Sequence, residues 1–128
     1  MILLWNSAAM QVELTLIDGD ARYDYEWQAG RELARDMLMY LRDRLAEHDM
    51  TFADVTGIGV FRGPGSFTGL RIGMTVLDTL AATNAIPIVG SVSEDWRSDC
   101  LQRLVAGQSD TIVLPEYGRE AHTTTPRK

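Results

Sequence analysis

The fold of this chain is decided by the stretch Gly63-Pro64-Gly65-Ser66-Phe67-Thr68-Gly69-Leu70-Arg71-Ile72-Gly73. An apolar run, 55–61, precedes this stretch, and a second apolar run, 72–82, begins inside it. A glycine-rich turn between two such runs is typical of a strand that leads directly into a helix. Such a turn brings backbone N–H groups and the positive end of the helix dipole to one place.

The turn does not match a phosphate loop of the Walker type. That loop has four residues between its first glycine and a Gly-Lys-Ser/Thr sequence. Here Gly65 and Gly69 are too close together, and Leu70 and Arg71 follow in place of lysine and a magnesium-binding hydroxyl. The backbone N–H groups at the turn could still bind an anion in another way. A nucleotide- or anion-binding module that uses the turn 63–69 is the alternative function for this chain.

Three strands are predicted before the turn, at 2–5, 12–16 and 22–27. Apolar and polar residues alternate in the second and third, as in strands with one face toward solvent. The sequence Asp18-Gly19-Asp20 between them is a turn signal, so the three strands are predicted to form an antiparallel meander.

The spacing of apolar residues predicts a helix over 31–48, and the glycine-rich turn opens a second helix that runs to about Thr83. A strand follows at 86–92. Ser93 is the expected N-cap of a third helix that ends near Gly107, and 111–114 is predicted to be a short last strand. The fold class is therefore α/β, with a mixed sheet in which three antiparallel strands precede alternating helices and strands.

The length, charge and composition of the chain argue against some classes of function. The chain has 128 residues, a net charge of −6 and one cysteine. This length suits a single domain, and the acidic balance argues against a protein that grips nucleic acid by itself. Because the sequence contains no run of 18 apolar residues, no membrane contact is expected and a cytoplasmic location is predicted.

Three segments resemble the TsaB (YeaZ) family: 2–9, 54–73 and 114–120. The resemblance implies one ribonuclease-H-like half of the fold shared by actin, sugar kinases and Hsp-type ATPases. Asn6 stands where the family pattern has aspartate, and an amide has no charge for a metal ion. Only about twenty residues join the fifth strand to the Pro-x-Tyr-x-Arg ending, where family members carry a second domain. We therefore expect one domain over 1–118 and a polar tail over 119–128.

The resemblance also implies a function. It predicts a noncatalytic subunit that binds and activates a TsaD-like transferase in the synthesis of threonylcarbamoyladenosine on tRNA. A TsaE-like ATPase would belong to the same assembly, a homodimer could use the same helices, and tRNA would be contacted only indirectly. The predicted partner-binding residues lie on the first two helices and are Met37, Tyr40, Leu41, Arg44, Phe67, Leu70, Arg71, Met74 and Leu77.

The motif residues are predicted to have structural roles; they are Gly63, Pro64, Gly65, Ser66, Gly69 and Gly73. Ser66 is expected to cap the helix, and the first glycines to allow a tight turn with unusual φ. Gly69 and Gly73, four residues apart, permit close approach of another backbone, which could belong to this chain or to a partner.

No catalytic residue, cofactor or metal site is predicted. His48 and His122 lie far apart in sequence, and Cys100 is expected to be buried in packing. A protease is the weakest candidate, because Ser66 does not stand in a Gly-x-Ser-x-Gly pattern and no base accompanies it.

Overall fold

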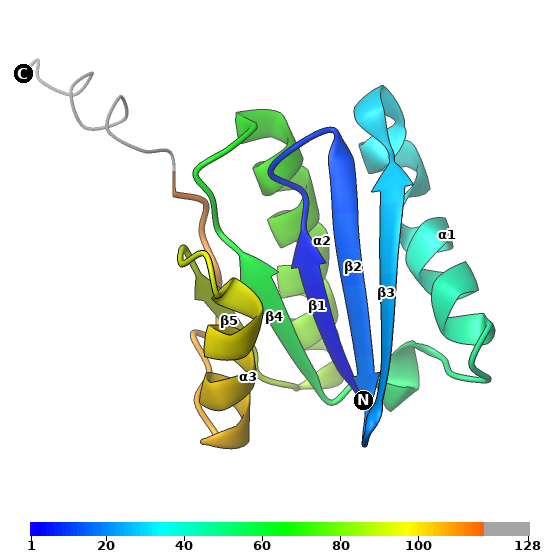
Figure 1. Ribbon diagram of the computed structural model, residues 1–128, viewed down its shortest axis with the longest axis vertical. Coiled ribbons are helices and arrows are strands. Elements are labelled where there is room, and N and C mark those ends of the chain that lie inside the picture. Colours follow the sequence, from blue (N-terminus) through cyan, green and yellow to red (C-terminus); the bar gives the residue numbers. More distant parts are fainter. Residues whose placement is uncertain (117–128) are drawn as a thin grey trace, which may run out of the picture.

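A five-stranded mixed sheet forms the centre of the chain (Figure 1). The computed structural model describes residues 1–116. The strands are β1 (Ile2–Asn6), β2 (Gln11–Asp18), β3 (Ala21–Gln28), β4 (Gly57–Phe61) and β5 (Ile88–Ser91). They lie in the order β3-β2-β1-β4-β5. The first three pair antiparallel, whereas β4 is parallel to β1 and β5 is parallel to β4.

Helices cover both faces of this sheet. They are α1 (Leu33–Ala46), α2 (Phe67–Asn84) and α3 (Trp96–Val105), with short 3-10 turns η1 (Gly30–Glu32) and η2 (Phe52–Asp54). Figure 1 shows α1 and α2 on one face of the sheet and α3 on the other. The predicted α/β class and the meander of three strands are confirmed.

The core follows from the spacing of apolar residues in each element. Leu33, Met37, Leu41 and Leu45 recur every four residues along α1, and all four are buried. They pack with alternate residues of β2 and β3 and with the buried face of α2. A smaller cluster on the other face joins Leu4, Val89, Trp96 and Cys100. Because the strands in the middle of the sheet are covered on both faces, β4 shows the near-continuous burial expected of a central parallel strand.

The prediction of a last strand at 111–114 is wrong. Thr111 has a φ of 68°, which an extended strand does not adopt. The segment lies beside β5 and is held by side chains. The Asp78 carboxylate accepts a hydrogen bond from the backbone N–H of Val113 at 2.9 Å, and the Arg62 side chain donates one to the carbonyl oxygen of Leu114 at 2.8 Å. These side-chain hydrogen bonds hold the segment in place of the backbone hydrogen bonds of a strand.

The helix α3 also begins later than predicted. Asp95, not Ser93, is its N-cap residue, and no side chain caps it. The Ser93 hydroxyl instead accepts a hydrogen bond from the backbone N–H of Asp95 at 3.0 Å. Ser93 therefore closes a local turn ahead of the helix, which is the other common role of serine near a helix start.

Some predictions lie outside the described residues. The polar tail over 119–128, the end of the single domain at 118, the Tyr117 and Arg119 positions of the C-terminal motif, and His122 all fall in this part of the chain. Within residues 1–116, no helix is both long and apolar enough to cross a membrane.

Candidate functional site

The glycine-rich turn joins β4 to α2, as predicted. Ser66 is the N-cap residue of α2, and its hydroxyl accepts a hydrogen bond from the backbone N–H of Gly69 at 3.3 Å. Gly63 has a φ of 111°, which confirms the predicted unusual backbone. Gly65 has no such backbone. A Cβ on Gly65 would lie 2.5 Å from the Cβ of Ala8, so close approach of the β1–β2 loop is the reason for that glycine.

The surroundings of Gly69 and Gly73, two glycines within α2, show which backbone approaches this helix. A Cβ on Gly73 would lie 2.5 Å from both the Ser7 hydroxyl and the Trp5 indole nitrogen, and a Cβ on Gly69 would collide with the Ser7 carbonyl oxygen. Ser7 also donates a hydrogen bond to the carbonyl oxygen of Gly69 at 2.8 Å. The close approach is therefore internal, between α2 and the end of β1.

This packing uses the groups that an anion site would need. The backbone N–H of Ser66 donates to the carbonyl oxygen of Ala8 at 2.6 Å, and that of Gly69 donates to the Ser66 hydroxyl. The Asn6 side chain accepts from the Ala8 N–H at 2.9 Å and donates to Glu13 at 3.2 Å. Two of the N–H groups of the turn 63–69, those of Ser66 and Gly69, thus already have acceptors within the fold.

The structure corrects more than half of the predicted partner-binding residues. Five of them are at most 2% exposed and belong to the core of this chain: Met37, Leu41, Leu70, Met74 and Leu77. The helix α2 is apolar on more than one side, and its stripe of Leu70, Met74 and Leu77 faces the sheet. Sequence periodicity could not say which apolar stripe of such a helix is the buried one.

The other four predicted residues lie at or near the surface. The Tyr40 ring stacks on Trp27 with centroids 4.2 Å apart, and Arg44 lies over Tyr40 and pairs with Glu47 at 2.8 Å. These contacts tie α1 to β3. Phe67 and Arg71 are exposed at the start of α2, where the Arg71 guanidinium lies 5.1 Å from the centre of the Phe67 ring.

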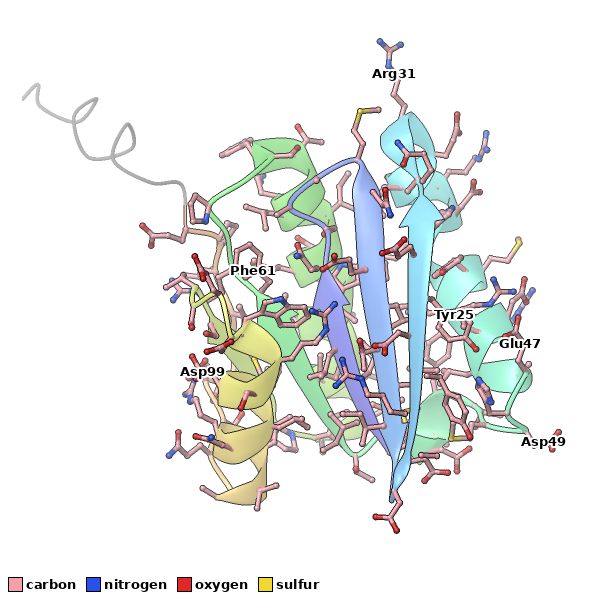
Figure 2. The ribbon with its side chains drawn as sticks, viewed as in Figure 1. Tyr25, Arg31, Glu47, Asp49, Phe61 and Asp99 are labelled. Atoms are coloured by element: carbon pink, nitrogen blue, oxygen red, sulfur yellow. The ribbon has the colours of Figure 1, made fainter. Side chains whose placement is uncertain are left out.

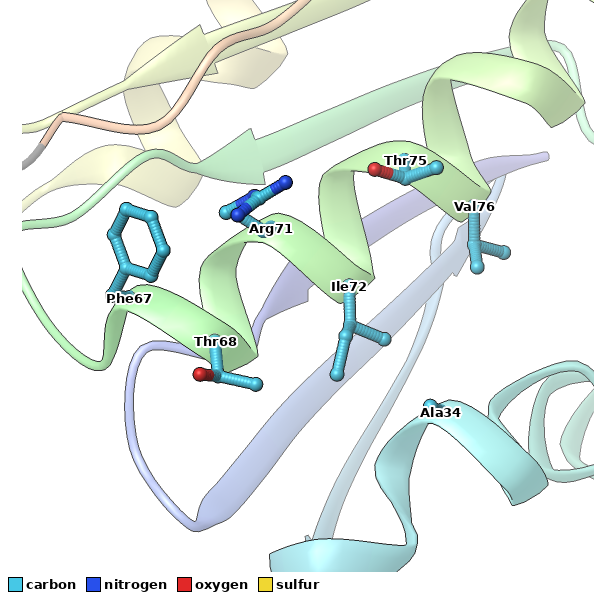
Figure 3. Close-up of a pocket in the computed structure, with 7 residues that line it drawn as sticks. All are labelled: Ala34, Phe67, Thr68, Arg71, Ile72, Thr75 and Val76. Carbon is cyan, nitrogen blue, oxygen red and sulfur yellow. The ribbon is translucent and has the colours of Figure 1, made fainter.

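A groove lies on the outer side of the two helices. It has a cavity volume of about 340 Å³, and Figure 3 shows Ile72 and Val76 extending from α2 toward α1, where Ala34 lies. A second cavity of about 380 Å³ at the same end of the molecule shares Thr68 and Ile72 with the first. We call the two together the α1–α2 groove. The groove residues that the sequence prediction missed are Ala34, Thr68, Ile72, Thr75 and Val76 in the first cavity and, among others, Met10 and Arg31 in the second.

His48 and Cys100 lie outside the groove and have structural partners. The His48 ring stacks on Tyr23 with ring centres 3.6 Å apart and lies 2.6 Å from the Tyr25 hydroxyl, so His48 has structural partners just after the end of α1. Cys100 is fully buried, and burial raises the pKa of its thiol to about 11. Among residues 1–116, no three His, Cys, Asp or Glu side chains are grouped to hold a metal ion.

Known proteins share sequence similarity with this chain. A family model described as "TsaD: tRNA N6-adenosine threonylcarbamoyltransferase" matches residues 27–94, more than half of the chain. The tRNA threonylcarbamoyladenosine biosynthesis protein TsaB of Escherichia coli is 26% identical over 128 aligned residues, which cover 93% of this chain and 50% of that protein. TsaB of Bacillus subtilis is 50% identical over 44 residues, or 34% of this chain and 19% of that protein.

A solved structure is also similar to this chain. YeaZ from Pseudomonas aeruginosa matches with a TM-score of 0.66 and 27% identity, over 70% of this chain and 42% of that one. This chain belongs to the TsaB (YeaZ) family. It spans about half the length of the TsaB protein of E. coli, and the matched region of the TsaD family model holds α1, the glycine-rich turn and α2. The family resemblance and the ribonuclease-H-like fold predicted from the sequence are confirmed.

Proposed function

We propose that this chain is a noncatalytic subunit that binds and activates a TsaD-like transferase in the biosynthesis of tRNA threonylcarbamoyladenosine. Its relatives are named for that pathway, and the family model that it matches is named for the transferase. The observation that carries the proposal is the α1–α2 groove, an apolar surface on the most family-like part of the chain.

The exposed apolar residues around the groove support a docking role. Leu38 is 54% exposed on α1 and Phe67 is 50% exposed on α2, and the half-buried Ile72 and Val76 lie between the helices. Leu38 follows Ala34 by four residues, so both lie on the same side of α1. Aromatic and aliphatic side chains of this kind form the centre of protein interfaces when a partner covers them.

The noncatalytic part of the proposal rests on how the reactive side chains are used. Cys100 is buried with a raised pKa, and His48 and Ser66 each serve a structural contact. Among residues 1–116, no histidine or cysteine lines the groove. In the complex that we propose, the transferase supplies the reacting groups, a TsaE-like ATPase joins the assembly, tRNA is contacted only through the partner, and the location is cytoplasmic.

A binding experiment tests this proposal with a matched pair of variants. Leu38 and Met39 are neighbours on α1 with similar exposure, 54% and 56%, but only Leu38 shares the groove side with Ala34. The TsaD-like protein of the same organism is co-purified with the wild-type chain, with Leu38→Asp and with Met39→Asp, and its transferase activity is measured with each.

We expect a complex with the wild type and with Met39→Asp, and loss of both complex and activation with Leu38→Asp. Because the two variants make the same change at equally exposed sites of one helix, a difference between them reports the groove and not the stability of the fold. If the folded wild-type chain neither bound the TsaD-like protein nor altered its activity, the proposal would be wrong.

The anion-binding alternative is less well supported. The backbone N–H groups of Ser66 and Gly69 already have acceptors within the chain, and the first-strand position holds Asn6 in place of aspartate. Unchanged thermal stability in the presence of ATP or ADP with magnesium would agree with this, because a ligand that binds only the folded state raises stability.

A further inference from the structure

The arginines of this chain fall into two groups. Each arginine among residues 1–116 forms a salt bridge with a described carboxylate, except Arg31 and Arg71. Both of these side chains are exposed, and both line the α1–α2 groove: Arg71 on the first cavity and Arg31 on the second. In a chain with a net charge of −6, the two arginines among residues 1–116 that have no carboxylate partner thus lie at one surface.

The two arginines come from different elements and flank an apolar centre. Arg71 extends from the first turn of α2 beside Phe67 (Figure 3), and Arg31 projects outward from η1, beyond the end of the sheet (Figure 2). Thr68 and Ile72, which the two cavities share, lie between them along the groove. The surface therefore offers an apolar strip with a positive charge in each of its two parts.

From this arrangement we propose that the segment seated in the α1–α2 groove is acidic: an apolar stripe flanked by carboxylates, one near Arg31 and one near Arg71. The proposal rests on the proposed function and names the chemistry of the partner segment at that same surface. Arginine pairs with carboxylates in a bidentate geometry, and charges at the rim of an interface select partners and speed their association.

A second copy of this chain fits the groove less well. The helix α2 carries only Arg71 and Asp78 as charged residues, and Asp78 is engaged by the backbone of Val113. On α1, Asp36 and Asp43 already pair with Arg35 and Arg42. A copy would therefore bring its own arginines to the interface together with carboxylates that have partners, and like charges across an interface are unfavourable.

Charge-reversal variants test the proposal. The affinity of the TsaD-like protein of the same organism is measured by calorimetry for the wild type, for Arg31→Glu/Arg71→Glu and for Arg31→Lys/Arg71→Lys, at low and high NaCl. Arg22→Glu is the control for a change of charge alone, because Arg22 is another exposed arginine, on β3 and on the opposite face of the sheet. Circular dichroism confirms that each variant is folded.

We expect the double reversal to weaken binding by about tenfold or more at low salt, because it turns two attractions into repulsions. The lysine variant, which keeps the charges but loses the bidentate geometry, should weaken binding clearly less than the double reversal. The loss should shrink in about 0.5 M NaCl, which screens exposed charges. Arg22→Glu should bind like the wild type.

Other outcomes separate the two proposals. Equal affinity of the wild type and the double reversal, while Leu38→Asp abolishes the complex, would overturn the acidic segment and leave the docking role standing. Absence of any wild-type complex would overturn both. Self-association or tRNA binding of the chain that the double reversal removes would show that a second copy or RNA occupies the groove, and would also overturn the proposal.

Discussion

The indole nitrogen of Trp5 lies 2.5 Å from the place that a Cβ would take at Gly73. The same nitrogen donates a hydrogen bond to the Ser7 hydroxyl at 2.9 Å, and Ser7 in turn donates to the carbonyl oxygen of Gly69. The end of β1 and the first turns of α2 are therefore joined by one short chain of hydrogen bonds. This contact fixes where α2 lies on the sheet, and hence where the groove forms beside α1.

Gly73→Ala should destabilise the chain although alanine is the better helix former. The methyl group would press on Trp5, which is fully buried and cannot move aside. We expect a loss of about 1–3 kcal/mol in the free energy of unfolding, against the gain of about 0.5–1 kcal/mol that alanine brings to a helix interior. Urea denaturation measures the net change in the free energy of unfolding. The control is Thr75→Ala, at an exposed site of the same helix. A more stable Gly73→Ala variant would show that α2 does not approach β1 this closely.

Leu70→Ala and Leu38→Ala should differ sharply in stability. Leu70 is 1% exposed and lies against the sheet, whereas Leu38 is 54% exposed on the side of α1 that carries Ala34. Truncation of the buried leucine leaves a cavity and should cost about 2–5 kcal/mol. Truncation of the exposed one should change stability by about 0.5 kcal/mol or less.

The same pair separates folding from docking. Leu38→Ala should weaken the complex with the TsaD-like protein while the chain stays as stable as the wild type. Leu70→Ala should weaken the chain itself, as followed by thermal unfolding in the absence of any partner. Equal stability of the two variants would contradict the assignment of Leu70 to the core.

Cys100 should be unreactive in the folded chain. Its side chain is fully buried, and its pKa of about 11 leaves almost no thiolate at pH 8. Because it is the single cysteine of the sequence, labelling with a thiol reagent reports one site. We expect no labelling of the native chain over the time in which the urea-unfolded chain reacts fully. Rapid labelling of the native chain would mean that α3 does not stay packed on the sheet.

Acid should weaken the attachment of the segment that follows α3. The hydrogen bonds from Arg103 hold the pKa of Asp110 below its usual range, and the backbone N–H of Gly90 donates to the same carboxylate at 2.9 Å. A carboxyl group whose pKa is lower in the folded state contributes stability above its unfolded pKa, and this stability is lost as the pH falls through the folded pKa. The contribution therefore falls progressively below about pH 4 and is lost as the pH falls through the lowered pKa of Asp110.

Asp110→Asn measures this contribution. The variant should be less stable than the wild type at pH 7 by about 1 kcal/mol or less, because the pair with Arg103 is partly exposed to solvent. The gap should narrow as the pH falls below about 4 and through the lowered pKa of Asp110, because the carboxyl group of the wild type then becomes protonated. Urea denaturation at several pH values follows the gap. A gap that stays constant with pH would show that charge does not hold this contact.

The class of fold, the meander, the glycine-rich turn and the family of this chain could all be predicted from the sequence. These follow from local signals: alternation in β2 and β3, four-residue spacing in α1, and glycines where a strand turns into a helix. Such signals depend on neighbours along the chain, so periodicity is enough to find them.

Tertiary structure alone decided which apolar stripe of α2 is buried, and so which residues can meet a partner. Leu70, Met74 and Leu77 face the sheet, while Ile72 and Val76 line the groove, yet all five are apolar residues on one helix. The choice depends on where β1 and α1 press against α2, as at Gly73, and no local pattern carries that information. The grouping of Arg31 and Arg71 has the same origin, because folding brings η1 and the first turn of α2 to one groove.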